Sequence, residues 1–291
     1  MTGARMIGDR PVSAIGLGAM PLSTAGRPDP EDALETLRSA FDAGVTLVDT
    51  ADAYCLDASD TGHNEQLVAE ALRRRGRRTD VVTVATKGGH VRTATGGWVT
   101  DGRPAYLHAA CRASARRLGV DTIDLYQFHR PDPAVPFADS VGALQELRDD
   151  GVVRFVGISN VTVEQLDEAR AIVDVAAVQN QLSPDFTSSV PELQRCTELG
   201  IAFLAWAPLG GRGGAGSIAE RHSCLRDVAR RHGVTSQQIV LAWLLSLSRV
   251  CIPIPGARRP ASVVDSAAAA RIVLDDDDLE RLEALLPPSI G

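Results

Sequence analysis

The segments VTLVDTADAY (45–54), VVTVATKGG (81–89) and TIDLYQFHR (122–130) share one order, in which an apolar run suited to a strand is followed by polar side chains. Each run is short, rich in β-branched residues and almost continuously apolar, as in parallel strands that are buried on both faces. Similar runs occur at 14–18, 152–159, 176–180, 201–206 and 250–254. The sequence therefore predicts eight strands.

Amphipathic segments separate these strands. The clearest of them, PEDALETLRSAFDAG (30–44), begins with Pro30 and ends with Gly44, which is the usual asymmetry of helix ends. The same pattern is found at 64–76, 106–119, 137–151, 161–173 and 191–200, in a pair of helices around 223–247, and at 275–286. Strand-then-helix units without a break in composition predict a (β/α)₈ TIM barrel over residues 1–291 as a single domain. We expect loops at 88–104 and at the glycine-dense 210–216.

The opening MIGDRPV (6–12) places Gly-Asp between two short extended pieces, and we expect it to form a hairpin that closes the bottom of the barrel. The alternative fold is an open doubly wound sheet with a Gly-x-Gly-x-x-Gly turn after its first strand. Gly16 and Gly18 supply two of these glycines, but Pro21 stands where the third should be. The dinucleotide fingerprint therefore fails.

Composition excludes several other classes of protein. A net charge of −7 and a pI of about 5.4 give no electrostatic case for nucleic acid. The chain has no apolar run of 18 residues and its N-terminus lacks a continuous apolar stretch, so we expect neither a membrane span nor a secretory signal. The five cysteines form no Cys-x-x-Cys pair, which favours reduced thiols in a cytoplasmic enzyme without a metal site. The oligomeric state stays open.

Polar side chains follow three of the predicted strands. Asp49 ends the strand at 45–49 and Tyr54 comes shortly after it, Lys87 follows the strand at 81–86, and His129 follows the strand at 122–128. In a (β/α)₈ barrel the carboxyl ends of the strands meet at one rim, where the chemistry takes place. We therefore expect Asp49, Tyr54, Lys87 and His129 to converge.

These four residue types suit the reduction of a carbonyl group. A tyrosine is a weak proton donor at neutral pH, and a neighbouring Lys87 ammonium is expected to lower the pKa of Tyr54 toward the working range. Asp49 would keep Lys87 charged, and His129 would orient the carbonyl oxygen. Because no side chain supplies a hydride, a cofactor must bring it.

The same segments resemble the aldo-keto reductase superfamily, whose catalytic tetrad matches Asp49 and Tyr54 in VDTADAY, Lys87 in ATKGG and His129 in LYQFHRPDP. The likeness continues through VGISN (156–160), VQNQLS (178–183), AWAPLGG (205–211) and IPIPGARRP (252–260), and so covers essentially the whole chain. It implies a barrel that binds NADPH and donates its hydride to a small-molecule carbonyl substrate, with Tyr54 as the acid.

The resemblance also implies how the cofactor would be held. Ser159, Asn160 and Gln179 would hydrogen-bond the nicotinamide carboxamide, and Trp206 stands where the family has an aromatic residue that stacks on the ring. The backbone of a glycine-rich loop would wrap the pyrophosphate, at Leu209, Gly210 and Gly211. The adenosine end would lie at the start of a late helix, near Gly256, Arg258, Arg259, Ser262 and Asp265. Its two arginines favour NADPH over NADH.

The chain departs from the family's pattern at several positions. Much of the family has lysine at position 256, arginine and asparagine at 262 and 266, glutamate at 265, and glycine where Cys55 follows the tyrosine. Only PPSIG (287–291) follows the last predicted helix, whereas family members that select bulky substrates use long C-terminal loops. We therefore expect an open pocket that tolerates polar groups, and Trp98 or His90 in the loop 88–104 either lines it or packs elsewhere.

Other readings of the same residues stay open. Sugar-derived carbonyls and pyridoxal are possible substrates alongside simple aldehydes and ketones. A Schiff-base aldolase would use Lys87 as a neutral nucleophile, which the nearby Asp49 disfavours. A non-catalytic NADPH-binding sensor or regulatory subunit could keep the same four residues; the lack of an extension before the hairpin counts against it.

Overall fold

A computed structural model describes residues 3–76 and 81–286. Its main sheet contains eight parallel strands, as predicted, in the order β12-β11-β10-β9-β8-β5-β4-β3. Their bounds are β3 (Leu17–Gly18), β4 (Leu47–Asp49), β5 (Thr83–Gly88), β8 (Ile123–Phe128), β9 (Val153–Ser159), β10 (Val175–Gln181), β11 (Ala202–Trp206) and β12 (Cys251–Ile254). Because all eight run the same way, their carboxyl ends share one rim.

The first and last strands of the sheet meet and close the barrel. The amide of Gly16 donates to the carbonyl of Pro253 at 3.0 Å, and the amide of Gly18 donates to the carbonyl of Pro255 at 3.1 Å. A parallel bridge also joins Gly18 to Gly256. A Cβ atom on Gly18 would lie 2.8 Å from the carbonyl oxygen of Ile254, so this seam has no room for a side chain. The predicted TIM barrel is confirmed.

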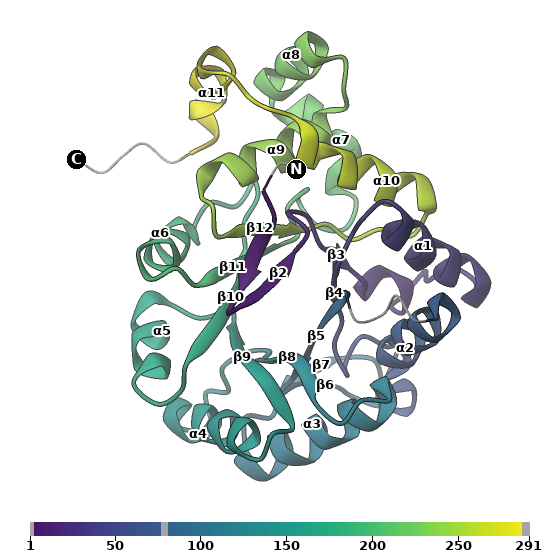
Figure 1. Cartoon of the computed structure of the whole chain (residues 1–291), viewed down its shortest axis with the longest axis vertical. Coiled ribbons are helices and arrows are strands. Elements are labelled where there is room, and N and C mark those ends of the chain that lie inside the picture. The colour runs from purple at the N-terminus through teal and green to yellow at the C-terminus, as the bar shows by residue number, and fades with distance from the viewer. Residues whose placement is uncertain (1–2, 77–80, 287–291) are drawn as a thin grey trace.

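A hairpin of β1 (Arg5–Ile7) and β2 (Arg10–Val12) lies across the amino-terminal end of the barrel, in front of it in Figure 1. Ile7 and Val12 belong to the apolar cluster that also contains the inward-facing Leu47 and Leu125. The guanidinium of Arg10 donates to the hydroxyl of Thr83, the first residue of β5, at 3.2 Å. The hairpin thus closes the bottom of the barrel, as the sequence predicts.

Helices surround the strands on the outside (Figure 1). They are α1 (Pro30–Asp42), α2 (His63–Arg75), α3 (Pro104–Leu118), α4 (Phe137–Asp149), α5 (Val163–Arg170), α6 (Val190–Leu199), α7 (Gly214–Arg221), α8 (Ser223–His232), α9 (Ser236–Leu247), α10 (Pro260–Ala268) and α11 (Asp276–Leu282). Among the residues described, no helix combines the length and the apolar character needed to cross a membrane. The tail 287–291, which bears on the openness of the pocket, lies outside the described residues.

Two segments differ from the loops that the sequence predicts. The segment 88–104 contains a small antiparallel hairpin, β6 (His90–Arg92) with β7 (Trp98–Thr100). The glycine-dense segment 210–216 ends inside α7, which begins at Gly214. Arg221 at the end of α7 pairs with Asp185 at 2.7 Å and also donates to the carbonyl of Gly214 at 3.1 Å. These tertiary contacts hold a helix whose glycines have low intrinsic helix propensity.

A buried polar cluster joins α2 and α3 to β5 just behind the rim. Glu65 is buried, pairs with Arg117 at 2.5 Å and accepts a hydrogen bond from the hydroxyl of Thr86 at 2.6 Å. Asp52 is buried close by, with the Tyr106 hydroxyl 3.5 Å from one carboxyl oxygen and no partner for the other among the described residues. Burial, helped by the negative charge of Glu65, raises the pKa of Asp52 from 3.8 to about 8.

We expect Asp52→Asn to stabilise the protein more at pH 8 than at pH 5. The folded state keeps the Asp52 carboxyl protonated up to about pH 8, whereas the unfolded chain releases this proton near pH 3.8. Raising the pH between these two values therefore favours unfolding of the wild type, by up to about 1.4 kcal/mol per pH unit. Asparagine removes this dependence. Denaturant unfolding of both proteins at several pH values measures the difference.

The matched control is Asp121→Asn, which makes the same substitution at an exposed position. Groups that titrate in both proteins cancel in the comparison. A difference between Asp52→Asn and wild type that stays constant from pH 5 to pH 8 would contradict the raised pKa of Asp52.

Candidate active site

Asp49, Tyr54 and Lys87 meet at the carboxyl-terminal rim of the barrel. Asp49 is the last residue of β4, Lys87 is the last but one of β5, and Tyr54 lies in the segment that follows β4. The Lys87 ammonium donates to the Asp49 carboxylate at 2.6 Å, to the carbonyl of Thr50 at 2.9 Å and to the Tyr54 hydroxyl at 2.9 Å. An ammonium has three N–H donors, so these acceptors use all of them. The predicted convergence of these three side chains is present.

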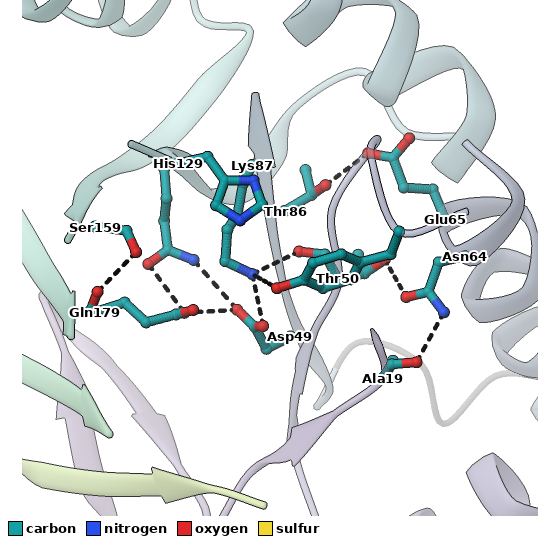
Figure 2. Close-up of polar contacts among 12 residues, drawn as sticks. Ala19, Asp49, Thr50, Asn64, Glu65, Thr86, Lys87, His129, Ser159 and Gln179 are labelled. Carbon is teal, nitrogen blue, oxygen red and sulfur yellow. Dashed lines mark hydrogen bonds and ion pairs between the residues drawn. The ribbon is translucent and has the colours of Figure 1, made fainter. Parts of the chain in front are cut away.

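Two glutamines hold Asp49 in this position. The carboxylate oxygen that does not face Lys87 accepts from the Gln179 side-chain amide at 2.7 Å and from the Gln127 amide at 3.3 Å. Figure 2 shows the contact of Lys87 with Asp49 and that of Asp49 with Gln179. Both glutamines project from barrel strands, Gln127 from β8 and Gln179 from β10, and both are buried. The carboxylate is therefore fixed by neighbours on three strands.

The charges of the lysine and the tyrosine follow from this geometry. Burial alone would lower the pKa of Lys87, but Asp49 and Tyr54 outweigh it and the pKa is raised, so Lys87 stays an ammonium. Burial also raises the pKa of the Tyr54 phenol, and the opposing effect of Lys87 does not overcome it. The expected lowering of the Tyr54 pKa is therefore wrong for this state of the protein. The reason is that the phenolate would be buried and would also face the negative charge of Asp49.

His129 stands beside the tyrosine at the end of β8. Its ring meets the Tyr54 ring edge to face, with centroids 5.7 Å apart and planes at 82°. Burial, together with the positive charges of Lys87 and Arg130, brings the pKa of His129 well below its usual value, so the imidazole is neutral. Its Nδ1 atom is buried and has no hydrogen-bond partner among the described residues. A neutral imidazole here carries one N–H donor.

Three of the residues expected to bind an amide are connected to this cluster. Ser159 ends β9, and its hydroxyl donates to the main-chain carbonyl of Gln179 at 2.7 Å, as Figure 2 shows. Asn160 has a left-handed backbone (φ 58°), and its side-chain amide donates to the carbonyl of His129 at 2.9 Å and to the hydroxyl of Ser159 at 3.0 Å. Trp206 ends β11, the strand that pairs with β10, and its indole N–H is buried without a partner among the described residues.

The predicted phosphate-binding segments lie on neighbouring loops. Gly210 and Gly211 both have left-handed backbones, with φ of 83° and 73°, and follow Leu209 after β11. The guanidinium of Arg258 donates to the carbonyl of Ala25 at 3.0 Å, and that of Arg212 donates to the same oxygen at 3.1 Å. Arg212, after β11, and Arg258, after β12, therefore both contact Ala25, which lies in the segment between β3 and α1.

The remaining predicted residues surround the start of α10. Arg259 is exposed at the N-cap of this helix, and the structure gives its guanidinium no hydrogen bond or ion pair with a described residue. Gly256 is exposed beside the barrel seam, and Ser262 is half-buried in the first turn. Asp265 accepts a hydrogen bond from the Thr235 hydroxyl at 3.1 Å.

A hollow of about 620 Å³ opens next to His129. Its lining is formed by the β6–β7 hairpin, the segment after β8 and the start of the segment after β9, namely His90, Trp98, Val99, Thr100, Arg130, Pro131, Pro133, Asn160 and Gln165. His90 and Trp98 therefore do line a pocket. Cys55 does not belong to this lining; it is buried, and its thiol points to the carbonyls of Ala53 and Asp57.

Several residues of the site escape the sequence prediction. Gln127 supports Asp49, and Thr50 supplies a backbone acceptor to Lys87. A polar residue inside the apolar run TIDLYQF was the available signal for Gln127, because strand interiors are otherwise apolar. A main-chain carbonyl such as that of Thr50 leaves no trace in the residue types.

Known proteins share this sequence and fold. A model of the aldo/keto reductase family matches residues 14–287. An uncharacterised oxidoreductase of Schizosaccharomyces pombe is 34% identical over 286 residues, which are 97% of this chain and 89% of that protein. The crystal structure of an aldo/keto reductase from Klebsiella pneumoniae in complex with NADP and acetate has a TM-score of 0.83 and 28% identity, and the match covers 100% of this chain and 97% of that one.

The glycerol dehydrogenase of Gluconobacter oxydans has a TM-score of 0.82 and 26% identity, and the match covers 98% of this chain and 95% of that one. These likenesses extend over the whole barrel, including the rim where the three hydrogen-bonded side chains lie. The chain belongs to the aldo/keto reductase family.

Proposed function

We propose that this protein is an NADPH-dependent oxidoreductase that reduces an aldehyde or a ketone to the corresponding alcohol. The observation that carries the proposal is the Tyr54 hydroxyl, which accepts a hydrogen bond of 2.9 Å from the buried Lys87 ammonium at the rim. The family supports an oxidoreductase, and the Klebsiella pneumoniae relative was crystallised with NADP.

The hydrogen bond from Lys87 gives Tyr54 the properties of a general acid. Lys87 occupies an acceptor position on the phenol oxygen, so the phenol's own hydrogen is free to point away from the lysine, toward a substrate. When the carbonyl oxygen gains electron density, Tyr54 transfers this proton to it and becomes a phenolate. The ammonium, already in contact with that oxygen and held by Asp49, stabilises the negative charge without further rearrangement.

His129 orients the carbonyl group. Its imidazole is neutral and stands edge-on to Tyr54, so its single N–H is available to hydrogen-bond the carbonyl oxygen that receives the phenol proton. A protonated imidazole would be a competing acid, and burial, together with the nearby charge of Lys87, disfavours it by lowering the pKa of His129. We therefore assign the proton transfer to Tyr54 and the positioning to His129.

The residues around the rim suit a nicotinamide dinucleotide. A reduced nicotinamide supplies the hydride that no side chain can provide. The indole N–H of Trp206 is buried without a partner among the described residues, and the left-handed Gly210 and Gly211 form a backbone segment without side chains on the next loop. Ser159, Asn160 and Gln179 would hold the carboxamide, and Leu209, Gly210 and Gly211 would hold the pyrophosphate.

A preference for NADPH over NADH would come from the start of α10. Arg259 presents a guanidinium without a partner among the described residues at the N-cap of this helix, where backbone N–H groups also attract phosphate. Gly256, Arg258, Ser262 and Asp265 would complete the adenosine end.

The charged state of Lys87 argues against the Schiff-base aldolase. A lysine nucleophile must be neutral, whereas Asp49 and Tyr54 raise the pKa of Lys87 against the effect of burial. A cofactor-binding sensor would bind NADPH without turning over a carbonyl compound, and it is an outcome of the experiment that follows.

We expect Tyr54→Phe to lower kcat for the NADPH-dependent reduction of an aldehyde by about 10²- to 10⁴-fold, because phenylalanine cannot donate a proton. Affinity for NADPH should stay within about threefold, since the ring shape is kept and the cofactor contacts lie on other residues. Steady-state kinetics and fluorescence titration with NADPH measure the two quantities.

The control for this experiment is Tyr106→Phe, because the hydroxyl of Tyr106 lies behind the rim near Asp52 and not next to Lys87. This variant should keep kcat. Unchanged turnover in Tyr54→Phe would remove the tyrosine from its proposed role, and tight NADPH binding by a wild type that reduces no aldehyde would favour the sensor.

We expect Arg259→Gln to lower kcat/KM for NADPH by roughly 10-fold or more and to leave kcat/KM for NADH unchanged, because only NADPH carries the 2′-phosphate. The exposed Arg226 on α8 provides the matched control, so Arg226→Gln should alter neither value. An equal loss with both cofactors would show that Arg259 does not discriminate between them.

A further inference from the structure

The hollow next to His129 contains an arginine without a counter-charge. Of its nine lining residues, Arg130 is the one that is charged at neutral pH, and none is an aspartate or a glutamate. His90 is neutral, because burial, together with Arg130 and Arg92, brings its pKa to about 4. In a protein of net charge −7, this pocket is therefore locally positive.

Arg130 is exposed, and it makes no ion pair or side-chain hydrogen bond with any residue that the structure describes. The nearest acid along the chain, Asp132, is occupied elsewhere: its two carboxylate oxygens accept from the amides of Gly102 and Ala134, both at 2.9 Å. The positive charge of Arg130 is nonetheless felt at the site, since it contributes to the lowered pKa of both His90 and His129. Arg130 lines the same hollow as His90, whose ring lies 5.0 Å from the His129 ring, so its guanidinium can bind an anion on the side of the hollow near His129.

One wall of the hollow is aromatic. The rings of His90 and Trp98 stack with centroids 4.5 Å apart, and the guanidinium of Arg92 lies 4.2 Å from the Trp98 ring centroid. Trp98 still exposes 40% of its surface although it is held from two directions. Because His90 also contacts the His129 ring, with centroids 5.0 Å apart, the aromatic wall begins beside the proposed carbonyl site.

We propose that the substrate is a carbonyl compound with an anionic group, a carboxylate or a phosphate, which Arg130 binds while the body of the molecule lies against Trp98 and His90. This inference rests on the proposed carbonyl reduction and deepens it. A guanidinium offers paired N–H donors that match both anions, and without an acidic partner it loses no existing ion pair when it binds one. Because His129 and Arg130 are adjacent in the chain, one small molecule can place its carbonyl group at His129 and its anionic group at Arg130.

The experiment compares two aldehydes of nearly equal shape, 4-carboxybenzaldehyde and its neutral methyl ester, methyl 4-formylbenzoate. The ester group withdraws electrons more strongly than the carboxylate, so intrinsic reactivity favours the ester. We expect wild-type kcat/KM to be roughly 10-fold higher for the acid, mostly through KM, and this preference should shrink at high salt. Glyceraldehyde 3-phosphate compared with glyceraldehyde distinguishes phosphate from carboxylate as the preferred anion.

Arg130→Gln should abolish the preference for the anionic aldehyde over the neutral ester, and Arg130→Lys should keep part of that preference. Arg103→Gln is the matched control, because Arg103 lies on the same side of the barrel but pairs with Asp101 at 2.6 Å and does not line the hollow. A wild type that reduces both aldehydes equally well, or a preference that survives Arg130→Gln, would overturn the inference and leave carbonyl reduction intact.

A binding measurement separates this inference from the proposed function. Calorimetric titration of 4-carboxybenzaldehyde and of its ester into the protein with NADP⁺ requires no turnover. We expect a Kd about 10-fold lower for the acid in the wild type and equal values in Arg130→Gln. Failure of all aldehydes to be reduced contradicts carbonyl reduction, whereas equal Kd values in the wild type contradict the role of Arg130.

Discussion

The buried ammonium of Lys87 is the group on which the rest of the site depends. A charge removed from water costs several kcal/mol unless its hydrogen bonds and its counter-charge are both supplied. Here Asp49, the carbonyl of Thr50 and the Tyr54 hydroxyl supply them, all from the stretch of chain that ends β4 and follows it, whereas Lys87 comes from β5. Since β4 and β5 must pair in the correct register for these atoms to meet, the pairing that builds the barrel also sets the geometry of this cluster.

The groups around the rim differ in charge and in how deeply they are buried. At neutral pH His129 and His90 are uncharged because they are buried among cations, whereas Lys87 keeps its charge through Asp49. The guanidinium of Arg130, by contrast, is exposed. The hollow beside His129 is thus lined by a neutral imidazole, that of His90, and by the Arg130 cation. This arrangement would attract an anionic molecule without placing a competing acid beside Tyr54.

The strands and the polar residues that end them could be predicted, because apolar runs and the polar residues after them are local patterns in sequence. The β6–β7 hairpin was missed although Gly96 and Gly97 mark its turn, since the runs on either side are only three residues long. The helix α7 was missed because its glycines disfavour a helix and a distant partner, Asp185, stabilises it. Likewise, neither the pKa of Asp52 nor the unpaired state of Arg130 can be seen in a sequence, because each depends on which side chains other segments bring near it.

The closure of the barrel has a consequence for the order in which the protein folds. The seam joins Gly16 and Gly18 to Pro253, Pro255 and Gly256, so its contacts span most of the chain. Contacts of such long sequence separation form late, because a large loop must lose its freedom first. During synthesis on the ribosome one edge of β3 therefore stays unpaired until β12 has emerged. The early strands can assemble only as an open sheet, and the barrel closes only after β12 has been synthesised.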